Sequence, residues 1–197
     1  MKRALLALLF LSGCATSGYG HLPADQQADV HRIETYMNGV TGMQASFNQT
    51  GPNNGVSAGR FVYMPGHLRL DYVTPHTMEL VAGDGHLVLD DMESGAVTHL
   101  SLKRNPLGLL LHYPIRFDRG IQVTDVRRGQ GSLQVSVAEA DNPSQGLLTL
   151  QFSDTAGKLL LIGLQGVDAR QNHFSVSLGN VVEGVTVTPT VFTPPGG

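Results

Sequence analysis

Residues 55–59 have the sequence Gly-Val-Ser-Ala-Gly and match the G-x-S-x-G pattern that presents a nucleophilic serine in many hydrolases. That pattern works when a strand, a sharp turn and a helix hold the serine hydroxyl at the top of a parallel sheet. Here residues 60–63 continue as a strand-like segment, and no helical pattern follows them. We therefore expect no nucleophilic role for Ser57. Hydrolysis of short acyl esters that is lost in Ser57→Ala would restore the esterase hypothesis.

Other candidate chemical groups also lack the required spacing. The eight histidines show no H-x-H or H-E-x-x-H pattern, which argues against a metal site built on them. The glycines at 83–85 and 129–131 precede strand-like segments, whereas a phosphate site needs a helix N-terminus. Asp90 and Asp91 end a predicted strand and are typical of edge charges. We expect no catalytic residue, no metal and no cofactor.

Composition limits the remaining function classes. The chain has 197 residues, of which 41% are hydrophobic and 15% charged, and its formal net charge is −3. This balance argues against a nucleic-acid-binding protein that works through a basic face. A single cysteine excludes an internal disulfide framework and any multi-cysteine metal cluster. The length suits one domain with a sizeable core.

The N-terminal residues predict export. Lys2 and Arg3 precede an apolar run that is too short to span a bilayer, as in a signal peptide. Residues 11–14, Leu-Ser-Gly-Cys, resemble the bacterial lipobox, in which the cysteine is acylated and becomes the mature N-terminus. We expect a signal peptide over 1–13, lipidation at Cys14, and a tether over 14–23. By resemblance to lipoproteins without aspartate after the cysteine, Ala15 implies the outer membrane. An ordinary cleaved signal with an incidental Cys14 remains the alternative.

Hydrophobic periodicity then predicts one long helix followed by strands. Val30, Ile33, Met37 and Val40 form one apolar stripe, which indicates a helix over residues 24–42. Residues 105–112, with Pro106 and four leucines, indicate either a short apolar helix or a loop that fills the core. Between and after them, alternating segments separated by turn residues predict short antiparallel strands. These expected strands cover residues 43–47, 56–64, 68–72, 78–82, 87–89, 96–101, 121–126, 133–137, 147–152, 159–164 and 173–178.

The predicted fold class is α+β, an unclosed antiparallel β-barrel of about eleven strands whose concave face is covered by the two helices. No strand–helix–strand alternation appears, so a doubly wound fold is not expected. The whole of residues 24–197 would form this domain.

Several segments resemble the periplasmic outer-membrane lipoprotein carrier family, which includes the LolA carriers and the anchored LolB receptors. Residues 43–49 are similar to the family stretch after its first helix, and residues 59–72 to its G-x-[FL]-x-x-x-R-P-x-x-[FL]-R-W-x-Y stretch. The match continues through residues 80–85, the Pro-containing segment at 105–111, and Phe-Thr-Pro-Pro-Gly at 192–196.

This resemblance implies a half-barrel that shelters the acyl chains of lipoprotein cargo in an apolar cavity, without chemistry. The implied partners are acylated lipoproteins, inner-membrane release machinery or a carrier or receptor counterpart, and a membrane reached through the N-terminal lipid. A monomer is expected. The residues that we expect to line the cavity are Phe47, Val62, Met64, Leu68, Leu70, Tyr72, Leu80, Leu87, Leu89, Leu109 and Leu110.

Two positions depart from the family pattern. Met64 replaces the arginine whose hydrogen bonds to the lid keep family carriers closed, and Leu70 replaces a tryptophan. Together with the lipobox, these departures favour an anchored protein closer to the receptors than to the carriers. Two alternatives stay open: a soluble periplasmic shuttle, and a structural envelope lipoprotein whose barrel is filled by its own side chains.

Overall fold

The computed structural model describes residues 19–194, so the predicted signal peptide, Cys14 and the beginning of the predicted tether lie outside the described residues. The described chain contains two α-helices, α1 (Ala24–Gly39) and α2 (Leu107–Leu110), and eleven strands. The strands are β1 (Met43–Thr50), β2 (Val56–Met64), β3 (His67–Thr74), β4 (Met78–Gly83), β5 (His86–Asp91), β6 (Ala96–Ser101), β7 (Ile121–Gly129), β8 (Ser132–Glu139), β9 (Gly146–Thr155), β10 (Lys158–Asp168) and β11 (His173–Glu183).

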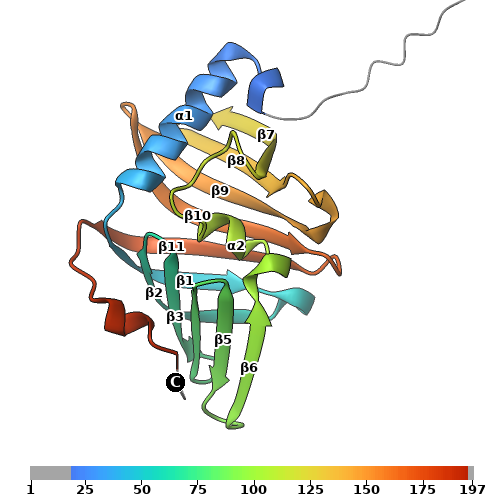
Figure 1. Cartoon of the computed structure of the whole chain (residues 1–197). Helices are drawn as coiled ribbons and strands as arrows, with labels where there is room; N and C mark the ends of the chain where they lie inside the picture. The colour runs from blue at the N-terminus through green and yellow to red at the C-terminus, as the bar shows by residue number, and fades with distance from the viewer. Residues whose placement is uncertain (1–18, 195–197) are drawn as a thin grey trace, which may run out of the picture.

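All eleven strands form one sheet in the order β6-β5-β4-β3-β2-β1-β11-β10-β9-β8-β7 (Figure 1). Each adjacent pair is antiparallel, and β6 and β7 form the two edges without pairing to each other. The predicted unclosed antiparallel barrel is therefore confirmed. Because β6 and β7 are consecutive in the chain, the segment between them, which includes α2, spans the open side of the sheet.

Local turn chemistry explains the hairpins. Asp84 and Gly85 have φ of 50° and 80°, and this left-handed pair connects β4 to β5 without a longer loop. Register shifts interrupt the pairing in four places, among them between Ala58 and Gly59 in β2 and between Val123 and Asp125 in β7. Such bulges bend strands and increase their twist, which gives this sheet its curvature.

The helix α1 covers one half of the curved sheet (Figure 1). Val30, Ile33 and Met37 are completely buried in the main core, as the predicted stripe requires. The helix ends at Gly39, three residues before the predicted boundary, because β1 starts at Met43. Tyr36 packs edge-on against Phe152 of β9 with ring centroids 5.6 Å apart.

A short C-terminal turn covers the opposite face of the sheet. Pro189–Phe192 forms a 3-10 turn, and Phe192 packs with Val62 and Val81 in a small cluster separate from the main core. This second cluster was not predicted from the sequence.

Candidate functional site

The main core lies on the inner, concave face of the sheet, and most of the predicted cavity residues lie there. Phe47, Leu68, Leu70, Tyr72, Leu80 and Leu87 are all buried in this core, and the partly buried Leu89 packs against it. The register explains why they share a face: Leu70 lies opposite Leu80, which in turn lies opposite Leu89. Phe47 and Tyr72 also stack edge-on, with ring centroids 5.1 Å apart.

Two predicted cavity residues lie on the other face. Val62 pairs with Arg69 and belongs to the small cluster around Phe192, and Met64 packs against that cluster. Their neighbours Phe61 and Tyr63 occupy the inner face instead, opposite Leu70 and Leu68. The structure thus corrects the sequence-based placement of Val62 and Met64. Because residues 61, 62 and 63 are all buried, their hydrophobicity alone could not show which of them face inward.

The inner face is covered by the α2 segment and the loop after it. Leu110 of α2 is 1% exposed and lies in the main core together with Ile115 and Phe117 of the following loop. The carboxamide of Asn38 in α1 fixes this loop: its Nδ2 donates to the carbonyl of Ile115 at 2.9 Å, and its Oδ1 accepts from the backbone N–H of Ile115 at 2.8 Å. The space between the sheet and its covers is therefore largely filled by side chains.

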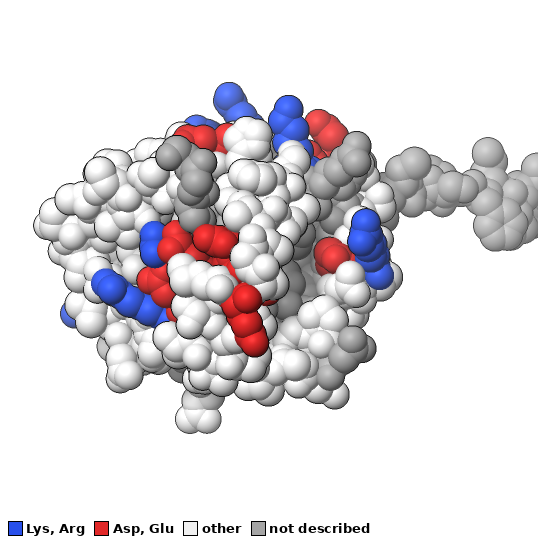
Figure 2. Space-filling view, turned by 90° about the horizontal axis from the view of Figure 1, so that it is seen from below, with Lys and Arg blue, Asp and Glu red and all other residues white. Residues whose placement is uncertain are grey.

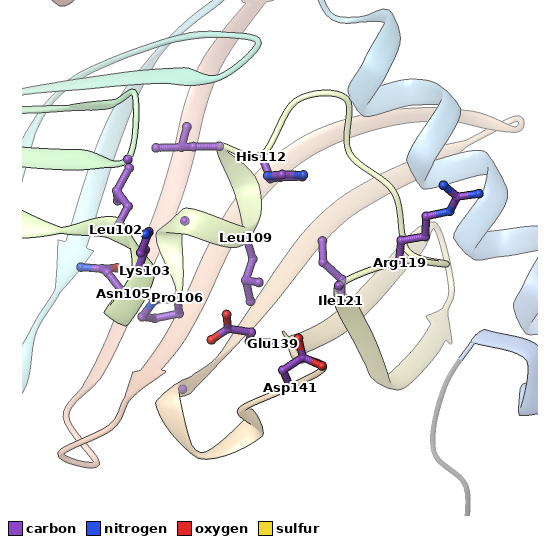
Figure 3. A pocket seen from close by; sticks show the side chains of 15 residues that line it. Leu102, Lys103, Asn105, Pro106, Leu109, His112, Arg119, Ile121, Glu139 and Asp141 are labelled. Atoms are coloured by element: carbon purple, nitrogen blue, oxygen red, sulfur yellow. The ribbon is translucent and has the colours of Figure 1, made fainter.

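A cavity with a volume of about 430 Å³ lies beside α2. It lies between the α2 segment and the adjoining ends of β7 and β8, where the sheet is open (Figure 3). Leu102, Leu111 and Ile121 line the cavity and also belong to the main core, so its apolar wall continues the inner face. The predicted residue Leu109 lines it as well and points toward Glu139 in Figure 3.

Polar side chains surround the apolar wall of this cavity. Lys103 and His112 come from the α2 side, and Arg119, Glu139 and Asp141 from the β7–β8 side. No sequence pattern marks these five residues as a group, because they are scattered over nearly forty positions and form no motif. The arrangement offers an apolar space with charged groups around it, which suits an amphiphilic ligand.

An ion-pair cluster holds α1 against the sheet. The Asp29 carboxylate is 3% exposed and accepts hydrogen bonds from Arg128 of β7 at 2.6 Å and from Arg32 at 3.1 Å. Arg32 continues to Asp154 of β9 at 2.8 Å. This contact holds the pKa of Asp154 below its usual range. The cluster ties α1 to β7 and β9 over the inner face.

A second polar cluster ties the C-terminal segment to the outer face. Arg69 donates to Asp71 at 2.7 Å, to Glu79 at 2.5 Å and to the carbonyl of Val191 at 3.0 Å. Burial raises the pKa of Glu79, and the charge of Arg69 opposes that rise. In the view from below, Asp and Glu gather in one region beside a few basic residues, and much of the visible surface carries no charge (Figure 2).

The structure gives the G-x-S-x-G segment a different explanation. Ser57 lies in β2 opposite Gln49, within a hairpin that leads into β3 and not into a helix. A Cβ atom at Gly59 would lie 1.9 Å from the carbonyl oxygen of Asp71, so the bulge requires glycine for close backbone approach. Gly59 of this pattern is therefore explained by the close approach of β2 and β3.

Within residues 19–194, no three His, Cys, Asp or Glu side chains converge as a metal site would require. In the same range, no helix combines the length and hydrophobicity needed to cross a bilayer.

The sequence also matches a known protein family. The sequence of residues 38–195 matches the model of the outer membrane lipoprotein carrier protein LolA. The chain belongs to the LolA family. A search of curated proteins found no significant match to this sequence.

One solved structure agrees with this fold, and two others are similar to a lesser degree. An uncharacterized conserved protein from Thermus thermophilus superposes with a TM-score of 0.50 at 9% identity, over 87% of this chain and 96% of that one. A putative outer membrane lipoprotein-sorting protein domain from Vibrio parahaemolyticus reaches 0.49 at 9% identity, over 87% and 97% of the two chains. The Mycobacterium tuberculosis lipoprotein LppX reaches 0.45 at 9% identity, over 83% and 98%. At such identities the first likeness concerns the fold alone.

Proposed function

We propose that this chain binds acylated lipoproteins, or their lipid chains, in the bacterial envelope and passes them toward the outer membrane without making or breaking covalent bonds. Membership of the LolA family supports a carrier role. The observation that carries the proposal is the cavity beside α2, whose wall of Leu102, Leu111 and Ile121 belongs to the main core. The inner face thereby has an opening to the outside at the one place where the sheet does not close.

The cavity has the properties that an acyl chain needs. Its volume of about 430 Å³ falls in the usual range of ligand pockets, about 300–1,000 Å³. Each methylene removed from water contributes about 0.8 kcal/mol, so an apolar wall alone can supply the affinity. Lys103, Arg119 and Glu139 can interact with the polar end of the ligand, where the acyl chain joins its carrier molecule.

The binding experiment compares a cavity variant with a matched surface variant. Palmitate is titrated against the wild type, Leu109→Glu and Val56→Glu, with binding followed by native mass spectrometry. We expect Leu109→Glu to bind at least ten times more weakly, because it places a carboxylate in the apolar wall. Val56 is 63% exposed, so Val56→Glu is expected to bind as the wild type does. A wild-type chain that ignores palmitate rejects the proposal.

The anchoring proposal rests on Cys14, which lies outside the described residues. We infer that acylated Cys14 holds the protein on the outer membrane, where as a monomer it takes cargo from a soluble carrier or from release machinery. Two or more acyl chains are needed for stable anchoring, and lipobox cysteines provide such a site. Detergent-phase partitioning of the wild type is expected to be lost in Cys14→Ser. A wild type that stays in the aqueous phase would instead support the soluble shuttle.

One observation favours a second function, that of a structural envelope lipoprotein. The inner face is filled by side chains of α1, of Leu110 and of Ile115 and Phe117. If these side chains never move apart, the barrel cannot bind an acyl chain. The palmitate titration separates the two functions, since a scaffold is expected to show no uptake at any concentration.

A further inference from the structure

The two edges of the sheet are protected very differently. At one edge, β7 carries Asp125, Arg127 and Arg128, contains a bulge, and is held to α1 by the Arg128–Asp29 ion pair. Charges, bulges and covering helices are the usual devices that prevent another strand from pairing with an edge. At the other edge, β6 consists of Ala96–Ser101, without proline, lysine or a carboxylate, and pairs with β5 without a bulge.

The whole of β6 is exposed, and no other described element lies along its free side (Figure 1). Val97 and Leu100 are 46% and 48% exposed. An uncharged exposed edge of this kind can accept an additional strand.

The register shows which backbone groups are available. The N–H of Leu102 donates to the carbonyl of Gly85 at 2.9 Å, so these two residues form a hydrogen-bonded pair. In an antiparallel ladder such pairs alternate with non-bonded pairs. Leu100 and Thr98 therefore direct their N–H and C=O groups toward β5, whereas those of Val97, His99 and Ser101 point outward.

This free edge leads directly to the cavity. The strand β6 ends at Ser101, and the next two residues, Leu102 and Lys103, line the cavity. A chain that starts at the cavity and runs antiparallel to β6 passes Ser101, His99 and Val97 in that order. At about 3.4 Å per residue, about six residues are enough to follow the strand.

We propose that β6 accepts the N-terminal peptide of an acylated cargo protein as an added antiparallel strand while the acyl chain occupies the cavity. This inference rests on the proposed function. The orientation fits a lipoprotein whose acylated residue is its N-terminus, because the lipid lies at the cavity and the peptide continues along the edge. The lack of charge on β6 makes the recognition depend on backbone hydrogen bonds, and hence little on the cargo sequence.

The test measures what the peptide adds to the lipid. Two probes, palmitate and an N-palmitoylated peptide of about seven serine, threonine and valine residues, are titrated against the full-length Cys14→Ser chain. The same titration is made with His99→Pro, which removes the outward N–H, and with His99→Ala, which keeps it. We expect the peptide to bind more tightly than palmitate to the parent chain and to His99→Ala. In His99→Pro we expect peptide binding to be about three- to ten-fold weaker and palmitate binding to be unchanged.

A second probe makes the result independent of the folding of the proline variant. The palmitoylated peptide is N-methylated at the residues that face β6, and on the parent chain we expect it to bind no better than palmitate. If palmitate binds and the unmodified peptide adds nothing, or if His99→Pro keeps the full gain, strand addition is overturned while the proposed function stands. If neither probe binds, the proposed function falls and this inference falls with it. The parent chain could instead form a dimer that His99→Pro dissociates and that the peptide does not disrupt. This result would assign β6 to a second copy of the chain and would also overturn the inference.

Discussion

Removal of Asp29 is expected to cost less stability than removal of the arginines around it. The Asp29 side chain is 3% exposed, whereas those of Arg32 and Arg128 are 35% and 56% exposed. In Asp29→Ala both arginines can turn to water, and Arg32 keeps its contact with Asp154. Charge-assisted hydrogen bonds contribute about 1.5–3 kcal/mol each, but solvent screening reduces this for exposed partners. We expect Asp29→Ala to lower the free energy of unfolding by about 1–2 kcal/mol.

The converse variant leaves a buried charge without its partners. Arg32→Ala combined with Arg128→Ala leaves the Asp29 carboxylate desolvated and without its two partners, which is expected to cost about 3–5 kcal/mol. Adding Asp29→Ala to these two substitutions removes the unpaired buried carboxylate. The triple variant is therefore expected to be more stable than the double variant.

Urea unfolding at pH 7, followed by circular dichroism in the Cys14→Ser background, measures these differences. The control is Asp25→Ala, an exposed carboxylate in the first turn of the same helix, for which the change is expected to stay below about 1 kcal/mol. A triple variant that is less stable than the double variant would show that burial of Asp29 carries no penalty, and would refute this account of the cluster.

Three further substitutions test the two faces of the sheet. Leu70→Glu buries an unpaired carboxylate at a position only 5% exposed, so loss of palmitate binding and at least about 3 kcal/mol of stability are expected by titration and urea unfolding. Met64→Arg lies on the outer face, so the rate of palmitate release is expected to be unchanged in stopped-flow measurements. Burial raises the pKa of Tyr72 to about 12, so stability is expected to fall between pH 10 and 12, and Tyr72→Phe to flatten that fall in urea unfolding at pH 9 and 11.

The strands could be predicted because hairpins are local. Each expected strand is present, since alternation and a turn signal such as Asp84-Gly85 lie next to each other in the sequence. The short helix at 105–112 is also present, as α2, with Pro106 at its N-cap and the Asn105 side chain accepting from the N–H of Leu107. Hairpins and short helices of this kind can be predicted from neighbouring residues alone.

The sequence could not predict those side-chain positions that depend on residues far away in the chain. Residues 61–64 are apolar throughout, so the sequence places Val62 in the cavity, although nothing in β2 reveals that Phe192, 130 positions later, covers the other side. Asp29 does not belong to the apolar stripe of the helix, and its burial depends on a partner 99 positions later, Arg128. The cavity itself joins residues 85 to 146 across the open side of the sheet, and no local pattern marks it.

The two covers of the inner face differ in what holds them, and this difference indicates which one admits a ligand. Helix α1 is fixed by the Asp29 cluster and by three fully buried apolar residues. Helix α2 has only four residues, and within it only Leu110 is buried. Exposing Leu110 costs about 1.5–3 kcal/mol, and moving the whole α2 segment also exposes Leu111, Ile115 and Phe117. Burying a dozen methylenes of an acyl chain contributes about 10 kcal/mol, which is of similar size. If the proposed function holds, we therefore expect the α2 segment, and not α1, to be the cover that moves on uptake.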